Sequence, residues 1–147
     1  MKRGALIVVE GIDRSGKSTQ CKALVENLQR KKIHAEYMNF PDRKSEIGGV
    51  INSYITSKIN LPDEAIHLLF SANRWEKSEA MKKLLENGTT LVVDRYCYSG
   101  VAYSTAKGLD LKWCKSSDIG LLKPDRVFFL TIPLAELENR NGFGNER

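Results

Sequence analysis

The chain has 147 residues, 41% of them hydrophobic and 28% charged, and its formal net charge at pH 7 is +5. This length suits one domain with its own core and is short for two. The positive excess favours anionic partners, nucleotides as readily as nucleic acids, but the sequence lacks the long basic runs of nucleic-acid-binding tails. No apolar stretch is long enough to span a bilayer, so we expect neither a specific nucleic acid nor a membrane as partner.

Cys21, Cys97 and Cys114 lie far apart and form no C-x-x-C pair. They are predicted to be reduced, mostly buried thiols, which favours a reducing compartment. The apolar run near the first residue is short, contains acidic residues at its end and shows no cleavage pattern, so we expect no signal peptide and a cytoplasmic location. The sequence does not separate cytosol from nucleus. His34 and His67 are isolated, which argues against a zinc site.

Residues 5–9 form a continuous apolar run of the kind found in buried parallel strands. The segment Gly11-Ile-Asp-Arg-Ser-Gly-Lys-Ser18 fits the phosphate-binding pattern G-x-x-x-x-G-K-[ST]. Its glycines let the backbone approach a polyphosphate, and its N–H groups and the following helix start attract negative charge. Lys17 would reach the terminal phosphates, and the Ser18 hydroxyl would bind Mg²⁺. The alternative is a glycine-rich turn that carries a lysine by chance.

The apolar spacing of residues 21–28 predicts a helix directly after this loop. Strand, glycine loop and helix together are the context that a phosphate loop requires. A second strand is predicted over residues 35–40 and ends at Pro41. Arg43 then lies in a loop at the carboxyl end of this strand, where open α/β sheets bind their ligands. Apolar positions between residues 47 and 55 predict a second amphipathic helix.

A long helix is predicted from about residue 60 to residue 85, with Asn60 as its N-cap, Pro62 in its first turn and Gly88 as its C-terminal cap. Phe70 and Arg74 are four residues apart in this helix and share a face. The ring could stack on a planar base while the guanidinium bonds the edge of that base. The alternative is a core phenylalanine beside a solvated arginine.

Residues 89–93 show another buried-strand pattern, which Asp94, Arg95 and Tyr96 follow. An acidic residue at the end of an apolar strand suits a Mg²⁺ site, and Arg95 beside it would supply positive charge for a phosphate. The alternative is a surface contact between Asp94 and Arg95 alone.

The rest of the chain continues the alternation of helices and strands. Residues 99–107 are predicted to form a helix that carries Tyr103, residues 125–132 a fourth strand, and residues 134–139 the start of a helix. The glycine-rich, charged residues 140–147 are predicted to form a loop. Alternating strands and helices predict an α/β fold, in which a parallel sheet carries helices on both faces.

Taken together, these motifs resemble the thymidylate kinase family, of the eukaryotic and viral type. The resemblance spans essentially the whole chain and rests on Glu10-Gly-Ile-Asp-Arg-Ser-Gly-Lys-Ser-Thr-Gln20, Phe40-Pro-Asp-Arg43, His67-Leu-Leu-Phe-Ser-Ala-Asn-Arg-Trp-Glu76, Val93-Asp-Arg-Tyr96, Ser99-Gly-Val-Ala-Tyr103 and Lys123-Pro-Asp125. It implies a P-loop NTPase-type fold like that of nucleoside monophosphate kinases, in a single domain over residues 1–147. It also implies that, with ATP and Mg²⁺, thymidine monophosphate is phosphorylated to thymidine diphosphate, a step in dTTP synthesis. Because family members continue further, it implies a chain truncated within the lid region, without the last strand and helices.

The resemblance also implies the site residues. The implied catalytic residues are Arg14, Lys17 and Asp94. The implied ligands of ATP and its phosphates are Gly11, Asp13, Arg14, Ser15, Gly16, Lys17, Ser18, Thr19 and Arg140. The implied residues of the thymidine monophosphate site are Asp13, Phe40, Arg43, Phe70, Arg74, Arg95, Ser99, Gly100 and Tyr103. Mg²⁺ would be bound by Ser18 and, through water, by Asp94.

Within this set, Arg14 would bridge the donor and acceptor phosphates. Phe70 would stack on thymine and Arg74 would bond its carbonyl edge, which favours the functional interpretation of that pair. Tyr103 would lie against the deoxyribose, and Asp13 would bind a sugar hydroxyl. The family also forms homodimers through helices near the acceptor site, so we expect a homodimer.

Three other functions remain as alternatives. One is a nucleotide-binding fragment without turnover. Another is a GTP-hydrolysing switch, which would need a guanine-reading N-K-x-D motif that the sequence lacks. The last is a nucleic-acid-binding protein, which only the net positive charge supports.

Overall fold

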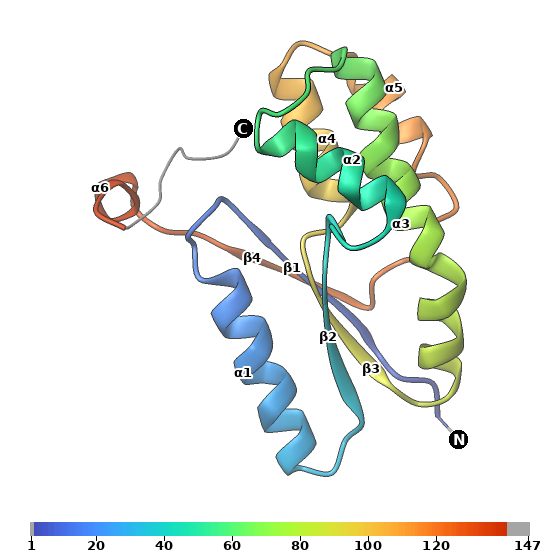
Figure 1. The fold of residues 1–147 in the computed structure, drawn as a ribbon. Helices are drawn as coiled ribbons and strands as arrows, with labels where there is room; N and C mark the ends of the chain where they lie inside the picture. Colours follow the sequence, from blue (N-terminus) through green and yellow to red (C-terminus); the bar gives the residue numbers. More distant parts are fainter. Residues whose placement is uncertain (1, 141–147) are drawn as a thin grey trace.

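The computed structural model describes residues 2–140. Its elements in chain order are β1 (Leu6–Gly11), α1 (Lys17–Arg30), β2 (Ala35–Asn39), α2 (Glu46–Ile55), α3 (Asp63–Glu86), β3 (Thr90–Asp94), α4 (Cys97–Ala106), α5 (Leu111–Ser116), β4 (Arg126–Leu130) and α6 (Leu134–Glu138). The strands form one parallel sheet in the order β2-β3-β1-β4, with helices packed on both sides (Figure 1). The predicted α/β class is confirmed.

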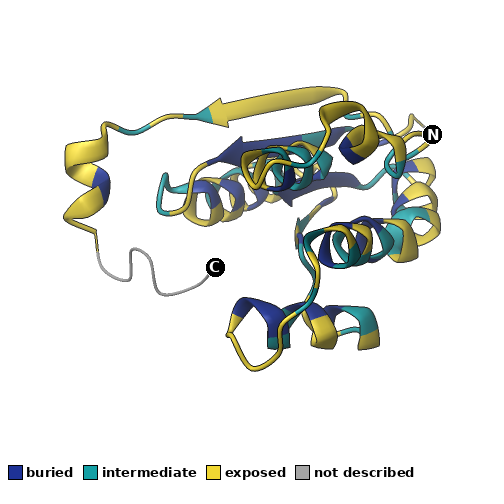
Figure 2. Cartoon of the chain, turned by 90° about the horizontal axis from the view of Figure 1, so that it is seen from above, coloured by how far each residue is buried: buried dark blue, intermediate teal, exposed yellow. Residues whose placement is uncertain are grey.

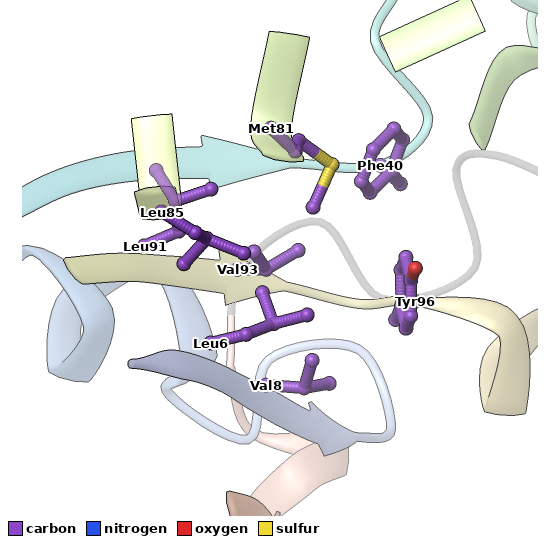
Figure 3. Packing of buried hydrophobic residues seen from close by; sticks show 8 residues of the cluster. All are labelled: Leu6, Val8, Phe40, Met81, Leu85, Leu91, Val93 and Tyr96. Carbon is purple, nitrogen blue, oxygen red and sulfur yellow. The ribbon is translucent and has the colours of Figure 1, made fainter. Parts of the chain in front are cut away.

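Helices α1 and α3 cover opposite faces of this sheet. The cluster on the α3 side consists of Leu6, Val8, Phe40, Met81, Leu85, Leu91, Val93 and Tyr96 (Figure 3). The cluster on the α1 side consists of Val9, Cys21, Val25, Ala35 and Val92. Successive side chains of β1 and β3 thus point to alternate faces and are buried on both, which is why these strands have continuous apolar sequences.

The parallel register aligns the carboxyl ends of β1, β2 and β3. Val9 in β1 lies opposite Asp94 in β3, and Asn39 in β2 lies opposite Asp94 from the other side. The loops that follow these strands therefore leave the sheet at one edge. They include the predicted phosphate loop, the segment around Phe40 and the segment that begins with Arg95.

Two helix starts differ from the sequence predictions. Asn60 is not the N-cap of α3: the helix begins at Asp63, and Pro62 occupies the cap position without a side-chain bond. A proline disfavours helical geometry in the residue before it, so Leu61 cannot be the first helical residue, as an Asn60 cap would require. Pro62 itself has ψ 147°, outside the helical region, so the helix starts at Asp63. The acidic side chains of Asp63 and Glu64 lie in the first turn instead, where they stabilise the positive end of the helix dipole. Helix α4 begins at Cys97, two residues before the predicted start at Ser99.

The short helix α5 was missed entirely. It has six residues, and the Asp110 side chain caps it by accepting the Trp113 N–H at 2.9 Å. Such a length is too short for an apolar period to show. The predicted glycine cap after α3 is confirmed, because Gly88 has φ +88° just beyond the helix end.

Strand β4 is an edge strand that, within the described residues, pairs only with β1. Its Val127, Phe128 and Phe129 side chains are largely exposed, and the strand stands out in yellow in Figure 2. It is shorter than the predicted span of 125–132. The predicted loop of residues 140–147 lies, apart from Arg140, outside the described residues. No helix within residues 2–140 combines the length and apolarity needed to cross a membrane.

The loop after β2 is attached to α3 through Asn73. The Asn73 Oδ1 atom accepts the Asp42 N–H at 2.8 Å, and its Nδ2 atom donates to the Asp42 carbonyl at 2.9 Å. Gly48 in α2 packs against the same carbonyl, since a Cβ atom added there would lie 1.9 Å from the Asp42 oxygen. The adjacent Gly49 has no atom within 4 Å of such a Cβ.

These two glycines make a matched pair for a stability test. We expect Gly48→Ala to lower the free energy of unfolding by about 1–3 kcal/mol, because the added methyl group must displace the loop. Gly49→Ala should raise it by up to about 1 kcal/mol, because alanine restricts the unfolded chain and favours the helix. Urea unfolding of both variants measures the difference. Equal stabilities would show that the Asp42 loop does not constrain α2.

Candidate active site

The loop between β1 and α1 borders a surface pocket. Its lining residues are Asp13, Arg14, Gly16, Lys17, Ser18, Thr19, Asp94, Arg95 and Arg140. Of the predicted donor-site residues, only Gly11 and Ser15 are not in this lining. Gly11 packs so closely that an added Cβ atom would lie 2.6 Å from the Leu130 carbonyl, and the Ser15 hydroxyl is buried with no hydrogen-bond partner among the described residues. Helix α1 starts here without a side-chain cap, so its first N–H groups can bind an anion.

Lys17 is the first residue of α1, directly after this loop, and is largely buried. Its Nζ atom donates to the Ile12 carbonyl at 2.7 Å. Burial lowers the pKa of Lys17, and the nearby positive charge of Arg95 lowers it further. An anion bound in the pocket would offset both effects, as a phosphate site requires. The Arg14 carbonyl accepts a hydrogen bond from the Arg140 guanidinium, which brings these two predicted residues together.

A second pocket lies between α3, α4 and the loop after β2. Every residue predicted for the thymidine monophosphate site lines it, and its lining is Asp13, Phe40, Pro41, Arg43, Tyr54, Ile55, Ile66, Phe70, Arg74, Arg95, Tyr96, Ser99, Gly100, Tyr103, Ser104 and Lys107. Its lining combines aromatic and aliphatic side chains with cationic ones. Asp13 and Arg95 line both pockets. The two pockets therefore meet at this pair of residues.

Arg95 is held at that boundary by several contacts. Its guanidinium pairs with the Asp13 carboxylate, donates to the Ser99 hydroxyl at 3.0 Å and lies 5.5 Å from the centre of the Tyr103 ring. Asp94, in contrast, accepts a hydrogen bond from the Tyr37 hydroxyl at 3.1 Å. The alternative of a surface contact between Asp94 and Arg95 is wrong, because each side chain has a different partner and faces a pocket.

Arg74 is buried in the second pocket and forms a bidentate ion pair with Asp118. Its Nε atom lies 3.1 Å from Asp118 Oδ1, and its Nη2 atom lies 2.9 Å from Oδ1 and 3.0 Å from Oδ2. The alternative of a solvated arginine is therefore wrong. Gly100 leaves room for the guanidinium, since a Cβ atom there would lie 2.8 Å from Arg74 Nη2. Phe70 lies one turn earlier in α3 and lines the same pocket.

The donor groups of the first pocket also fit a magnesium ion. Ser18 and Asp94 supply one hydroxyl and one carboxylate to its lining. Residues 2–140 contain no cluster of three or more histidine, cysteine, aspartate or glutamate side chains that could hold a metal alone. Mg²⁺ is commonly bound by one or two protein oxygens together with water and substrate phosphates. These residues suit that mode of binding.

Comparison with known proteins decides the family. A model of the thymidylate kinase family matches residues 9–147. Thymidylate kinase of Arabidopsis thaliana is 55% identical over 145 residues, which cover 99% of this chain and 55% of that protein. Thymidylate kinase of Danio rerio is 54% identical over 147 residues, which cover 99% of this chain and 69% of that protein. The chain belongs to the thymidylate kinase family.

The solved structure of thymidylate kinase from Candida albicans agrees with this assignment. It superposes with a TM-score of 0.91 at 44% identity, covering 99% of this chain and 70% of that one. The chain thus spans between about half and seven tenths of the length of these relatives. The fold expected from the resemblance, that of a P-loop nucleoside monophosphate kinase, is confirmed.

Glu10 is a buried residue, bonded to two residues that line the second pocket, that the sequence analysis did not single out. Its buried carboxylate accepts the N–H of Tyr96 at 2.9 Å and that of Ser99 at 3.2 Å, together with the Ser99 hydroxyl. The N-cap residue of α4 makes no side-chain cap bond of its own. Glu10 therefore caps α4 from the end of β1 and fixes Ser99 and Gly100 against the pocket. The sequence signal that could have identified Glu10 is its position as an acidic residue at the end of an apolar strand.

The Arg74–Asp118 pair yields a second stability test. Replacing Asp118 with alanine leaves the buried Arg74 charge without its partner, and we expect the free energy of unfolding to fall by about 3–5 kcal/mol. The control is Glu26→Ala, which removes an exposed pair with Arg30 at 3.7 Å and should change it by no more than about 0.5 kcal/mol. Urea unfolding compares the two. Equal losses of unfolding free energy in the two variants would mean that Asp118 does not compensate the buried charge of Arg74.

Proposed function

We propose that this chain transfers the γ-phosphoryl group of ATP to thymidine monophosphate. The observation that carries the proposal is the boundary of the two pockets at Asp13 and Arg95. Phosphoryl transfer needs the donor and acceptor oxygens close together and in line, and the enzyme contributes mainly position and positive charge. Two pockets that share Asp13 and Arg95 at their boundary meet that need.

In this proposal, the first pocket binds ATP. The N–H groups of the loop and of the α1 start hold the phosphates, and Lys17 neutralises their terminal charge. Arg14 and Arg95 act where charge is shared between the transferred and accepting phosphates. Ser18 and, through water, Asp94 hold Mg²⁺, which supplies further positive charge to the phosphate oxygens when it is bound.

The second pocket binds thymidine monophosphate. Phe70 stacks on the base, Arg74 bonds its carbonyl edge, and Arg43 holds the monophosphate together with Arg95. Tyr103, whose ring lies beside the Arg95 guanidinium, packs against the deoxyribose. An oxygen of the acceptor phosphate forms the new bond to the γ-phosphorus, while the bond from that phosphorus to the β-bridging oxygen breaks. The phosphate is already ionised near neutral pH, so no side chain has to remove a proton.

Two further features belong to this proposal. We infer that the chain forms a homodimer through its helices near the acceptor pocket, and exposed apolar side chains of α4 and α5, among them Tyr98 and Leu111, are compatible with such a contact. We also infer a cytoplasmic location, in which the free thiols of Cys21, Cys97 and Cys114 would stay reduced.

The direct test is a coupled phosphoryl-transfer assay with ATP, Mg²⁺ and a panel of nucleoside monophosphates. We expect product from thymidine monophosphate in preference to the others. Lys17→Ala should reduce kcat by several powers of ten, because it removes a charge from the transferred phosphate. Lys31→Ala, an exposed lysine at the far end of α1, is the control and should retain full activity. Near-normal turnover by Lys17→Ala would refute the assignment of the loop.

The same assay tests one alternative, a chain that binds nucleotides without turnover. It predicts no product from any acceptor in the same assay, while thymidine monophosphate still raises the melting temperature. Product formation excludes it.

A second prediction concerns the base. Phe70→Ala should weaken thymidine monophosphate binding by about 1–3 kcal/mol, because stacking and apolar burial are lost. Isothermal titration calorimetry measures the change, and Leu68→Ala, an exposed position on the same helix, should leave the affinity unchanged. Unchanged affinity in Phe70→Ala would assign Phe70 to the hydrophobic core alone.

A further inference from the structure

Tyr37 is the residue near the phosphate loop to which neither the sequence motifs nor the proposed reaction assigns a role. It lies in β2, two residues before Asn39, which pairs with Asp94 across the sheet. Its hydroxyl donates to Asp94 Oδ2 at 3.1 Å. No other side chain within the described residues is seen to bond the Asp94 carboxylate, so Tyr37 is the group that orients it.

The Tyr37 ring is fixed on the α1 side of the sheet. It packs against the cluster that contains Val9, Cys21 and Val92. The Lys22 ammonium lies 5.3 Å from the centre of the ring. A ring held between a packed core and a cation has little freedom to rotate, so its hydroxyl meets Asp94 in a defined direction.

Asp94 lines the first pocket together with Ser18, the other residue that would hold Mg²⁺. The Tyr37 hydroxyl therefore acts on one of these two groups directly, through its 3.1 Å hydrogen bond to the Asp94 carboxylate.

We propose that Tyr37 is a positioning residue for the magnesium site, whose hydroxyl fixes the Asp94 carboxylate for metal binding. The proposal rests on the proposed function, because Mg²⁺ enters the site with the ATP phosphates. A carboxylate that reaches a metal through water must point in one direction, and a hydrogen bond to one of its oxygens sets that direction. Partners of this kind typically contribute a factor of about 10–100 in metal affinity or activity.

The test is Tyr37→Phe, which removes the hydroxyl and keeps the ring that packs on α1. At saturating ATP and thymidine monophosphate, we expect the Mg²⁺ concentration for half-maximal activity to rise about 10-fold. The KM for thymidine monophosphate and the urea midpoint should not change. The control is Glu36→Gln, which removes the charge of an exposed β2 side chain next to Tyr37 and outside both pockets, and should alter none of these values.

A direct metal measurement separates this proposal from the proposed function. Electron paramagnetic resonance of Mn²⁺, used as the probe, gives its affinity for the protein–ADP complex without turnover. We expect Tyr37→Phe to weaken Mn²⁺ binding about 10-fold. Unchanged Mn²⁺ affinity, or the absence of Mn²⁺ binding by the unmodified chain, would overturn the role of Tyr37 whether or not phosphoryl transfer is seen. If the unmodified chain binds Mn²⁺ through Tyr37 but transfers no phosphoryl group, only the proposed function fails.

Discussion

β1 and β3 are parallel neighbours, and this pairing places the phosphate loop beside Asp94 and Arg95. Val9 lies opposite Asp94, and the Arg95 N–H donates to the Val9 carbonyl at 3.0 Å. The two chain segments that carry the charged groups therefore leave the sheet side by side. Parallel strands are stable only when helices cover both faces, so the packing of α1 and α3 is also what holds the two pockets in contact.

Local sequence patterns were sufficient to predict those features that depend on residues close together along the chain. The apolar runs of β1 and β3, the glycine loop and the start of α1 are of this kind, and they predicted the first pocket. Glu10 and Asp118 were not found, because the bonds that define their roles join residues 86 and 44 positions apart. For Arg74 the sequence left two alternatives open, and only its burial against Asp118 decides between them.

The Arg74–Asp118 pair is a contact that can orient a ligand-binding group without adding much to the stability of the fold. Removing two charges from water is costly, and a buried pair often stabilises a fold no better than apolar side chains would. The bidentate geometry, however, fixes the plane of the guanidinium before any ligand arrives. Because Arg74 lines the pocket with this fixed orientation, the base binding proposed above would not carry the entropy cost of ordering a long side chain.

The backbone at Arg14 and Arg95 extends this argument to the boundary of the pockets. Both residues have positive φ, 60° and 66°, a conformation that costs about 1–3 kcal/mol for a side chain other than glycine. It persists because the surroundings fix it: the Val9 carbonyl and Asp13 hold Arg95, and Arg140 holds the Arg14 carbonyl. The fold thereby fixes the backbone of one arginine that lines the first pocket and of one that lines both pockets. In the proposed reaction, charges oriented during folding would need no rearrangement when phosphate charge shifts from donor to acceptor, and this is the condition under which they stabilise a transition state most.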